Sequence, residues 1–361
     1  MATTTFQSWV IASQKDDFSG LVFKNVTSSR DLGAHDVHVE LRAASLNYRD
    51  LVIAKGKMGL KSSPNVVPGS DGAGVVVQVG SQVRSVKPGD RVVTHMVPRD
   101  FEDASLGEMD DSALPHFGHI SAGLGQGLNG TLTTHGVFRE SCLCKLEGEL
   151  GYEEAATLTC SGITAWNALM GLEGKKVKKG DWVLVQGSGG VSVAALQFAV
   201  AVGANVVATT SSDEKGARLR GLGASHVINY RQVPEWGSAA RKLTPSGRGF
   251  DIIVDVGGDA TLSQAVQAVR IDGLVVVAGL LGGAHEPVPL MSALQSICVV
   301  RGVLLGTRQM MADMVAFVAE RGIKPALDTE VFSLEEANLA YKRLEEQKHF
   351  SKVVIRIPGN N

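Results

Sequence analysis

Two hydrophobic patterns divide the chain, and they predict different architectures. In the amino-terminal part apolar and polar positions alternate, as at Val37, Val39 and Leu41, which is the period of a strand with one buried face. A valine-rich run at 72–80 is bounded by glycines, and the turn at 87–90 contains Pro and Gly. A β-rich domain is therefore expected at this end of the chain.

From Glu153 onward, short apolar runs alternate with helical patterns, and a helix is expected over 155–169. Strands are expected at 182–186, 205–209, 226–228, 251–255 and 274–278, and the tail adds a strand at 297–305, helices at 310–321 and 334–346, and a strand at 352–357. Strands that alternate with helices in this way predict a doubly wound parallel sheet with right-handed crossovers, so the fold class is α/β.

Between residues 98 and 136 neither period can be followed. An acidic stretch at 100–111 precedes a glycine-rich stretch at 123–130. Charge runs are usually solvated, and a loop this long inside a compact domain is otherwise functional. We expect a solvated excursion, with His116 and His119 as solvated loop histidines.

Composition then narrows the function classes. The 361 residues suffice for about two domains, and a formal net charge of -2 favours neither nucleic acid nor an anionic membrane. Four cysteines are too few for a disulfide framework, and neither a secretory signal nor an apolar run of about 18 residues is visible. A cytoplasmic protein is expected. The 42 glycines indicate tight turns and close backbone approaches, as in nucleotide-binding α/β proteins.

One glycine-rich run lies in the right context for a dinucleotide. Gly187-Ser188-Gly189-Gly190-Val191-Ser192 follows an expected strand and precedes an expected helix. Gly187 permits a tight turn, Gly189 lets the backbone approach a pyrophosphate, and the helix N-terminus faces its charge. Ser192 replaces the third glycine and is expected to push helix and strand slightly apart. The alternative is a plain strand-to-helix turn.

The end of the next strand favours NADP(H) over NAD(H). An acid there would bind the adenosine ribose hydroxyls and repel a 2'-phosphate, but this chain has Thr210. The hydroxyls of Ser211 and Ser212 and the cation of Lys215 suit a phosphate. The acids at 213–214 oppose this unless they point away in the first helical turn, where the helix dipole favours them.

The chain resembles the medium-chain dehydrogenase/reductase superfamily along nearly its whole length. The motifs that carry the resemblance are Asn47-Tyr48-Arg49-Asp50, 68–74, 87–92, Ser161-Gly162-Ile163-Thr164-Ala165, the run 187–192, 222–230 and 349–354. The resemblance implies a GroES-like catalytic domain at 1–161, a Rossmann NADP(H)-binding domain at 162–304, and a return at 305–361 that completes the first domain. Nicotinamide and substrate are then expected in the cleft between the two domains.

Alcohol dehydrogenases of this superfamily hold a catalytic zinc, and the matching positions here are Asn47, Ser70 and Cys160. A zinc site needs at least three protein ligands, and Asn and Ser are poor ones. The stretch 98–136 also lacks the four cysteines of a structural zinc lobe. We therefore expect no zinc, with Cys160 as a small buried residue. The pattern is similar to the zinc-free quinone oxidoreductases and enoyl reductases.

The resemblance also suggests catalytic residues. Tyr48 is the candidate donor of a hydrogen bond or proton to an enolate, and its alternative role is packing at a domain seam. Asn47 is the candidate donor to a substrate carbonyl or to the nicotinamide ribose, against a turn-capping role. Asp50 is expected to orient its neighbours, and Asp71 to act as a structural hydrogen-bond acceptor.

Further residues are assigned to the cofactor by the same resemblance. Thr164 is expected at the nicotinamide, Tyr230 at the adenine or its phosphate, and Lys352 at a cofactor phosphate. The alternatives are a helix threonine bonded to its own backbone and an exposed edge-strand lysine. The backbone segments expected to bracket the nicotinamide carboxamide are those of Gly279 with Leu280 and of Val303 with Leu305.

Together these features predict an NADPH-dependent, zinc-independent reductase of quinones or α,β-unsaturated carbonyls. Such acceptors delocalise the incoming charge, so hydrogen-bond donors can replace a Lewis acid. One alternative is an alcohol dehydrogenase or carbonyl reductase of the same fold. Another is a non-catalytic NADPH-binding sensor or scaffold. A homodimer is expected through the apolar edge at 297–300.

Overall fold

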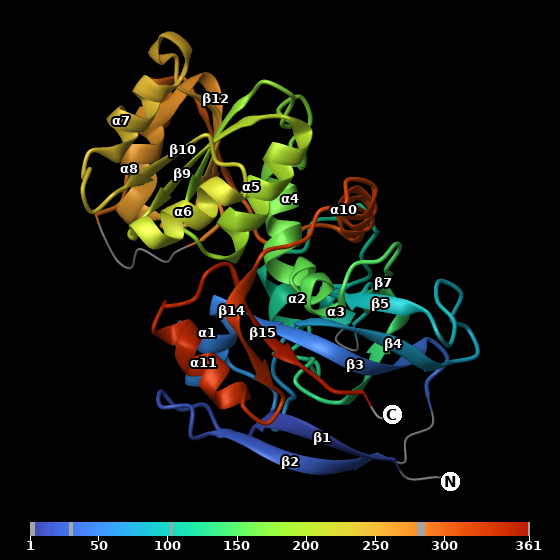
Figure 1. Cartoon of the computed structure of the whole chain (residues 1–361). Helices are drawn as coiled ribbons and strands as arrows, with labels where there is room; N and C mark the ends of the chain where they lie inside the picture. The colour runs from blue at the N-terminus through green and yellow to red at the C-terminus, as the bar shows by residue number, and fades with distance from the viewer. Residues whose placement is uncertain (1–3, 29–31, 102–103, 280–285, 360–361) are drawn as a thin grey trace. The chain divides into compact units, whose positions relative to one another are not determined.

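The computed structural model describes residues 4–28, 32–101, 104–279 and 286–359 (Figure 1). The chain divides into two compact units, one formed by Met1–Ser161 with Thr307–Asn361 and the other by Gly162–Gly306. The first unit is therefore discontinuous in sequence, because the second is inserted into it. Each unit has its own sheet, and each is described by itself below.

The second unit is built on a six-stranded parallel sheet in the order β10-β9-β8-β11-β12-β13. Its strands are β8 (Trp182–Gln186), β9 (Asn205–Thr210), β10 (His226–Asn229), β11 (Phe250–Asp255), β12 (Val269–Val277) and β13 (Val299–Gly302). All six residues of β11 are buried, as expected for a central strand covered on both faces. The chain reverses its direction of winding between β8 and β11, so the predicted α/β class and doubly wound sheet are confirmed.

Helices cover this sheet, and their order follows the winding. They are α4 (Ile163–Met170), α5 (Gly190–Val202), α6 (Asp213–Gly221), α7 (Trp236–Leu243), α8 (Asp259–Ala268) and α9 (Met291–Ser296), with the turn η4 (Pro245–Gly247) after α7. Helix α5 packs on β8 and β9 and α6 on β9 and β10, whereas α7 packs on α8, which lies on β11 and β12. Helix α5 ends at Gly203, whose φ of 91° is the left-handed conformation that glycine adopts without strain.

Several element boundaries differ from the sequence prediction. The single helix expected over 155–169 is divided into α3 (Tyr152–Ala156), a π-turn (η3, Leu158–Gly162) and α4. The hydroxyls of Thr157 and Thr159 donate to the carbonyls of Glu154 and Thr94, and such side-chain bonds compete with helical ones. The strand expected over 297–305 is only β13, because Ile297 adopts φ 49° at the end of α9. Helix α11 (Ala337–Glu345) begins three residues later than expected.

The first unit is built on a seven-stranded sheet in the order β14-β15-β3-β4-β5-β7, with β6 also paired to β3. Its strands are β3 (Asp36–Leu46), β4 (Asp71–Val79), β5 (Arg91–Thr94), β6 (His135–Arg139), β7 (Leu143–Lys145), β14 (Leu327–Ser333) and β15 (Lys352–Arg356), and β1 (Thr4–Ile11) and β2 (Leu21–Ser28) form a separate hairpin. The alternation predicted around Val39 is confirmed, because Val37, Val39 and Leu41 are all buried. The last strand, β15, returns to pair antiparallel with β3.

Short helices complete the first unit, and α11 packs on α1 and β15. They are α1 (Tyr48–Lys55), η1 (Ala104–Leu106), α2 (Phe117–Ala122), η2 (Glu140–Cys142), α3, α10 (Arg308–Glu320) and α11. The longest described helices, α5 and α10, have 13 residues each. In the described part of the chain, none is both long and apolar enough to span a membrane.

Only part of the segment 98–136 is the solvated excursion that its composition predicted: most of its acidic residues are exposed, but its later part is packed. Leu124 and Leu132 belong to the main hydrophobic cluster of the first unit, and the Arg49 guanidinium donates to the carbonyl of Leu124. His119 is buried, its Nε2 contacts the carbonyl oxygen of Leu106 at 2.9 Å, and its ring stacks on that of His116. The prediction of two solvated histidines is therefore wrong for His119, because α2 turns its ring inward.

Candidate functional site

Asn47 lies at the junction between a strand and a helix, and this junction sends two neighbouring side chains in opposite directions. Strand β3 ends at Leu46 and α1 begins at Tyr48, so Asn47 is the N-cap residue in extended conformation. Its backbone N–H donates to Asp50 Oδ2 at 2.8 Å, as acids at the third helical position commonly accept. Asn47 is 7% exposed, whereas Tyr48 is 47% exposed.

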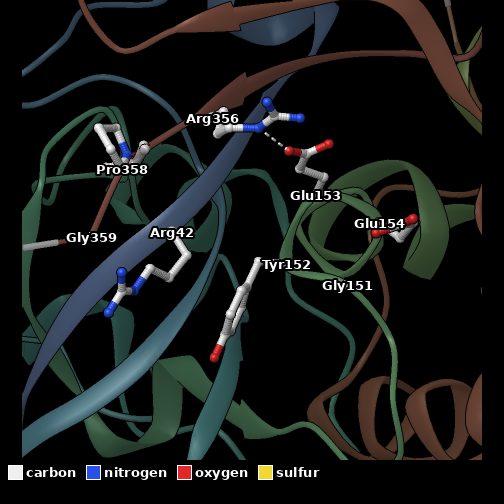
Figure 2. A pocket seen from close by; sticks show the side chains of 9 residues that line it. Arg42, Gly151, Tyr152, Glu153, Glu154, Arg356, Pro358 and Gly359 are labelled. Atoms are coloured by element: carbon white, nitrogen blue, oxygen red, sulfur yellow. Dashed lines mark hydrogen bonds and ion pairs between the residues drawn. The ribbon is translucent and has the colours of Figure 1, made fainter. Parts of the chain in front are cut away.

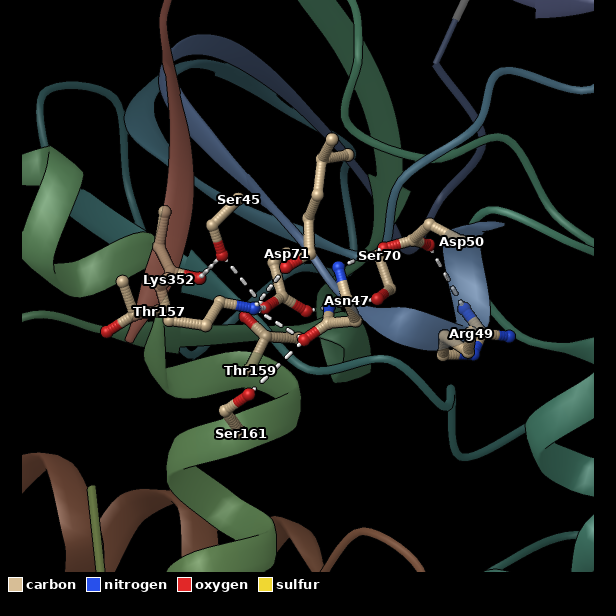
Figure 3. Close-up of polar contacts among 12 residues, drawn as sticks. Ser45, Asn47, Arg49, Asp50, Ser70, Asp71, Thr157, Thr159, Ser161 and Lys352 are labelled. Atoms are coloured by element: carbon tan, nitrogen blue, oxygen red, sulfur yellow. Dashed lines mark hydrogen bonds and ion pairs between the residues drawn. The ribbon is translucent and has the colours of Figure 1, made fainter. Parts of the chain in front are cut away.

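Lys352, the first residue of β15, places its ammonium group beside Asn47 (Figure 3). The group donates to the Leu46 carbonyl at 2.8 Å, to Asp71 Oδ2 at 3.0 Å and to Asn47 Oδ1. The β15–β3 register explains this position, because Val353 pairs with Leu46. Lys352 is 4% exposed, so these acceptors replace water for a charge that is costly to bury alone.

Asp71 supplies the opposite charge and is itself fully buried at the start of β4. Besides Lys352, it accepts hydrogen bonds from the hydroxyls of Ser70 and Ser45, each at 3.0 Å. Its two oxygens are thus held by an ammonium group and two hydroxyls, which compensates its removal from water. The arrangement matches the structural acceptor role that the sequence suggested.

The Asn47 amide is satisfied on one side only. Its oxygen accepts from Lys352 and from the Ser161 hydroxyl at 3.3 Å, but its Nδ2 is buried without a partner among the described residues (Figure 3). The amide cannot be turned over, because that would place its NH2 group against the ammonium. An unpaired buried donor costs about 1–3 kcal/mol, so this atom is the clearest candidate for ligand contact in the first unit.

Lys352 was predicted to contact a cofactor phosphate, and its position in the structure argues against this role. An ammonium group has three N–H donors, and Leu46, Asn47 and Asp71 accept from all of them. None is left for a phosphate. The alternative of an exposed edge-strand lysine is also wrong, because β15 lies between β14 and β3.

The residues at the zinc-ligand positions do not fit a zinc ion. The Asn47 oxygen and Asp71 already hold the Lys352 ammonium, and a divalent cation there would be repelled by it. Burial raises the pKa of the Cys160 thiol to about 12, which disfavours the thiolate that metals bind. Among the described residues, no three His, Cys, Asp or Glu side chains gather closely enough to hold a metal.

Asp50 is a second buried acid beside this network. Burial raises the pKa of its carboxyl group to about 6, although the nearby Arg49 guanidinium opposes the shift. Within the described part of the chain its Oδ1 has no hydrogen-bond partner, and Arg49 Nη1 lies 3.9 Å away. Asp50 therefore orients the start of α1 through its other oxygen, as the sequence suggested for it.

In the second unit, the candidate nucleotide site is made by backbone. Gly187 has φ 76°, Gly189 is the N-cap of α5, and no side chain of the described residues caps that helix end. A Cβ added to either glycine would meet no described atom within 4 Å, so the described part of the chain leaves space beside the turn. This geometry fits a cofactor pyrophosphate. Ser192 does not push helix and strand apart as expected, because its hydroxyl donates to the Gln186 carbonyl and joins them.

The residues assigned to the 2'-phosphate meet where β9 and β10 end. The Tyr230 N–H donates to the Thr210 carbonyl at 3.0 Å, and the Ser212 hydroxyl accepts from the Lys215 N–H to cap α6. Asp213 accepts from Asn229 Nδ2 at 2.8 Å and from Gln232. Asp213, whose charge would repel a 2'-phosphate, thus accepts hydrogen bonds from the amide groups of Asn229 and Gln232.

The residues assigned to the nicotinamide are distributed over the same unit. Thr164 is buried in α4. The Val303 N–H donates to the Val277 carbonyl, which brings the ends of β12 and β13 together. Leu305 has φ 57°, and its carbonyl accepts from Asn167.

Gly279 approaches the Val256 carbonyl so closely that an added Cβ would lie 2.7 Å from that oxygen. Leu280 lies outside the described residues, and the structure places Ser188, Gly190, Val191 and Ser211 beside the turns already described.

The sequence interpretation missed that Ser161 and Lys352 donate to Asn47 Oδ1 and that Ser45 donates to Asp71. One signal was present: Asp71 follows Pro68-Gly69-Ser70 without the metal that the family places there, so it needed another cation.

A hollow of about 480 Å³ in the first unit is lined by Arg42, Tyr152 and Arg356, among others (Figure 2). Its guanidinium groups already pair with Glu40 and Glu153, so we assign no ligand to it.

Comparison with known proteins gives matches over both units. Residues 33–148 match the alcohol dehydrogenase GroES-like domain, and residues 190–320 match the zinc-binding dehydrogenase family. A zinc-type alcohol dehydrogenase-like protein of Schizosaccharomyces pombe is 38% identical over 97% of this chain and 99% of its own length. An alcohol dehydrogenase of Geobacillus stearothermophilus is 30% identical, over 89% and 91%. The crystal structure of an NAD-dependent alcohol dehydrogenase superposes with TM-score 0.84 and 31% identity, covering 98% of this chain and 100% of that one.

Proposed function

Since the chain belongs to the medium-chain dehydrogenase/reductase superfamily, we propose that it is an NADPH-dependent oxidoreductase that reduces a quinone or an α,β-unsaturated carbonyl without zinc. The observation that carries the proposal is the Asn47–Lys352–Asp71 network, in which an ammonium group occupies the place of a metal ion's charge. The one unsatisfied atom of that network is a hydrogen-bond donor, Asn47 Nδ2.

The chemistry follows from this donor. A bound nicotinamide cofactor supplies a hydride, and the β-carbon of a conjugated carbonyl is the position that accepts it. The electron pair of the C=C bond then moves toward the carbonyl oxygen. Asn47 Nδ2 donates to that oxygen and stabilises the enolate. The exposed Tyr48 phenol, or water, supplies the proton that completes the reduction.

A conjugated acceptor suits such a site better than a simple ketone. Reduction of a simple ketone places the full charge on one oxygen, which calls for a Lewis acid or a strong proton donor. In an enone or quinone the charge is delocalised, so one preorganised amide donor suffices. The names of the relatives favour the second candidate, an alcohol dehydrogenase or carbonyl reductase.

Two features support NADPH as the cofactor. The strand end carries Thr210 instead of an acid, and Lys215 lies in the first turn of α6. Asp213 is held by Asn229 and Gln232. The glycine turn at 187–190 would bind the pyrophosphate, with Tyr230 near the adenine and Thr164 near the nicotinamide.

A homodimer is the proposed assembly. Strand β13 is the edge of its sheet, and the preceding helix α9 exposes Leu290, Met291 and Leu294. Ile297 and Val300 continue this apolar surface. An unpaired edge beside exposed apolar side chains favours pairing with a second copy.

The test measures oxidation of NADPH and of NADH with a panel in which each enone is paired with its saturated ketone. We expect turnover of the enones and quinones with NADPH, and slow or absent turnover of the saturated ketones. Matching rates for both members of each pair would instead support the carbonyl reductase. Tight NADPH binding without any turnover would support a non-catalytic protein. Elemental analysis of the same sample is expected to find no stoichiometric zinc, and one zinc per chain with loss of activity on chelation would contradict this.

A further inference from the structure

We propose that Lys352 is a positioning residue that turns the Asn47 amide into the electrophilic donor of the site. It would thus supply, from the last strand of the chain, the positive charge that a metal ion supplies elsewhere. The inference rests on the proposed function and adds a residue and a physical cause to it. It concerns the first unit alone, which contains every group involved.

The geometry is a continuous chain of hydrogen bonds. Asp71 accepts from the Lys352 ammonium, and the ammonium donates to Asn47 Oδ1 (Figure 3). The Asn47 amide then ends in Nδ2, the buried donor without a described partner. The three residues come from β4, β15 and the β3–α1 junction. Sheet pairing holds all three segments, since β15 and β4 flank β3.

The electronic consequence follows from the structure of an amide. A cation at the oxygen draws electron density from nitrogen toward oxygen, which makes the N–H groups more positive and better donors. Hydrogen bonds in such chains strengthen one another by about 10–30% each, and the low dielectric of a buried site preserves the effect. As negative charge develops on a substrate oxygen, Asn47 Nδ2 therefore stabilises it more than an ordinary amide would.

The surroundings keep the amide in this orientation. Two donors, from Lys352 and Ser161, converge on Oδ1, so the reverse orientation would oppose NH2 to an ammonium group. Asp71 pairs with the buried ammonium group at 3.0 Å, which compensates the removal of both charges from water. Without a ligand the arrangement leaves Nδ2 unsatisfied, which is a cost that a purely structural network would not retain.

Other roles for Lys352 agree less well with the same contacts. Its three donors are committed, so it can neither bind a phosphate nor donate directly to a substrate. Its burial excludes a solvated surface role. The amide stands between the ammonium and the open donor, so Lys352 acts through Asn47 and not on the substrate.

The experiment is a double-mutant cycle on kcat for an enone. Lys352→Met removes the charge and keeps the bulk, Asn47→Leu removes the amide, and the third variant carries both changes. We expect Lys352→Met to lower kcat by about 10- to 100-fold, a share of what a preorganised oxyanion donor provides. Asn47→Leu is expected to lower it at least as much. In the Asn47→Leu background, Lys352→Met is expected to change kcat less than about threefold.

A second readout separates electrostatic action from structural support. Across enones that differ in the electron-withdrawing strength of a ring substituent, Lys352→Met is expected to increase the sensitivity of kcat to the substituent. Lys352→Arg, which keeps the cation, is expected to stay near the unmodified sensitivity. If Lys352→Met does not fold, Lys352→Ala with added ethylammonium is compared with added tetramethylammonium, which has no N–H. Rescue by ethylammonium alone is expected.

The matched control is Lys145→Met on β7, where an exposed lysine pairs with Asp90. It is expected to leave kcat unchanged. Multiplicative effects in the cycle, or an unchanged substituent sensitivity in Lys352→Met, would overturn the role of Lys352 while the reductase activity stood. Absence of enone and quinone turnover in the unmodified protein would overturn the proposed function itself.

Discussion

The two candidate sites of this protein handle charge in opposite ways. In the second unit, the turn at Gly187–Gly190 offers backbone N–H groups and open space, with no side chain capping α5. In the first unit, the Lys352 network is filled with side chains that satisfy one another except at Asn47 Nδ2. The backbone turn of the second unit suits the permanent charge of a phosphate. The side-chain network of the first unit suits negative charge that develops on a substrate only during a reaction.

Substitutions in the two sites are expected to change different properties of the protein. A change at the backbone turn is expected to affect binding and leave the fold intact, because the space there is open. A change within the network is expected to affect rate and, at its charged members, stability.

Tyr48→Phe tests the exposed phenol next to Asn47 in the sequence, at the edge of the Lys352 network. The exposed phenol is the proposed proton donor, so its loss is expected to lower kcat by roughly 10- to 1,000-fold, by analogy with other oxyanion-stabilising donors. NADPH affinity is expected to stay nearly constant. Steady-state kinetics with one enone measure the change in kcat. An unaltered kcat would leave Asn47 and water as the donors.

Gly189→Ala tests the backbone site. The added Cβ meets no atom of the described residues within 4 Å, but it stands where the pyrophosphate would approach. NADPH affinity is expected to weaken about 100-fold, which corresponds to about 2.8 kcal/mol. The melting temperature is expected to stay unchanged, and calorimetric titration measures the affinity. Gly221→Ala, also in open space but in α6, serves as the control with normal affinity. A Gly189 variant that binds normally would move the cofactor away from this turn.

Lys215→Ala tests the choice of cofactor. If Lys215 forms a charge-assisted bond to the 2'-phosphate, NADPH binding weakens by about 1–3 kcal/mol. NADH binding hardly changes, since it has no such phosphate. Paired titrations with both cofactors give the difference. Equal affinity of the unmodified protein for NADPH and NADH would contradict the assignment.

Asp50→Asn tests the buried charge beside the network. The folded-state pKa of Asp50 is about 6, above its ordinary 3.8, so the protonated acid is favoured by folding. Its contribution to stability is fully present below about pH 4 and is lost as pH rises through 6. The variant is therefore expected to be more stable than the parent by up to about 3 kcal/mol at pH 8, and nearly equal to it at pH 4. Denaturant unfolding at both pH values measures this, and equal differences at the two would refute it.

Leu294→Glu tests the proposed interface of the second unit. Leu294 is 67% exposed on α9, so the change costs the folded chain less than about 0.5 kcal/mol. A charge in an apolar interface is expected to convert the dimer to a monomer at micromolar concentration. Light scattering gives the mass, with Leu339→Glu on the exposed face of α11 as the control. A monomeric parent would reject the interface.

Local patterns predicted most of the second unit. The alternation of apolar strands with helices specified the parallel sheet, and the glycine run between a strand and a helix specified the turn of φ 76° at Gly187. These features depend on residues close together in sequence. The errors there were at boundaries, such as the end of α9, where Ile297 adopts φ 49° and shortens the strand expected over 297–305.

The first unit was less predictable. Its sheet joins strands from both ends of the chain, and the segment 98–136 gave no period although Leu124 and Leu132 enter the core. His119 looked solvated because its neighbours in sequence are polar, yet its neighbours in space are Leu106 and the His116 ring. Burial in this segment depends on packing against other strands.

The family, the two kinds of sheet and the backbone turn could be inferred from the sequence alone, because each depends on short runs of residues. The sequence also identified Asn47, Ser70 and Cys160 as the residues at the positions of the zinc ligands, and Asp71 as an acceptor beside them. Only the tertiary structure decided that Lys352 neutralises Asp71 and holds the Asn47 amide. The physical reason is distance along the chain: Lys352 and Asn47 are 305 positions apart, and only the pairing of β15 with β3 brings a buried charge to its partners.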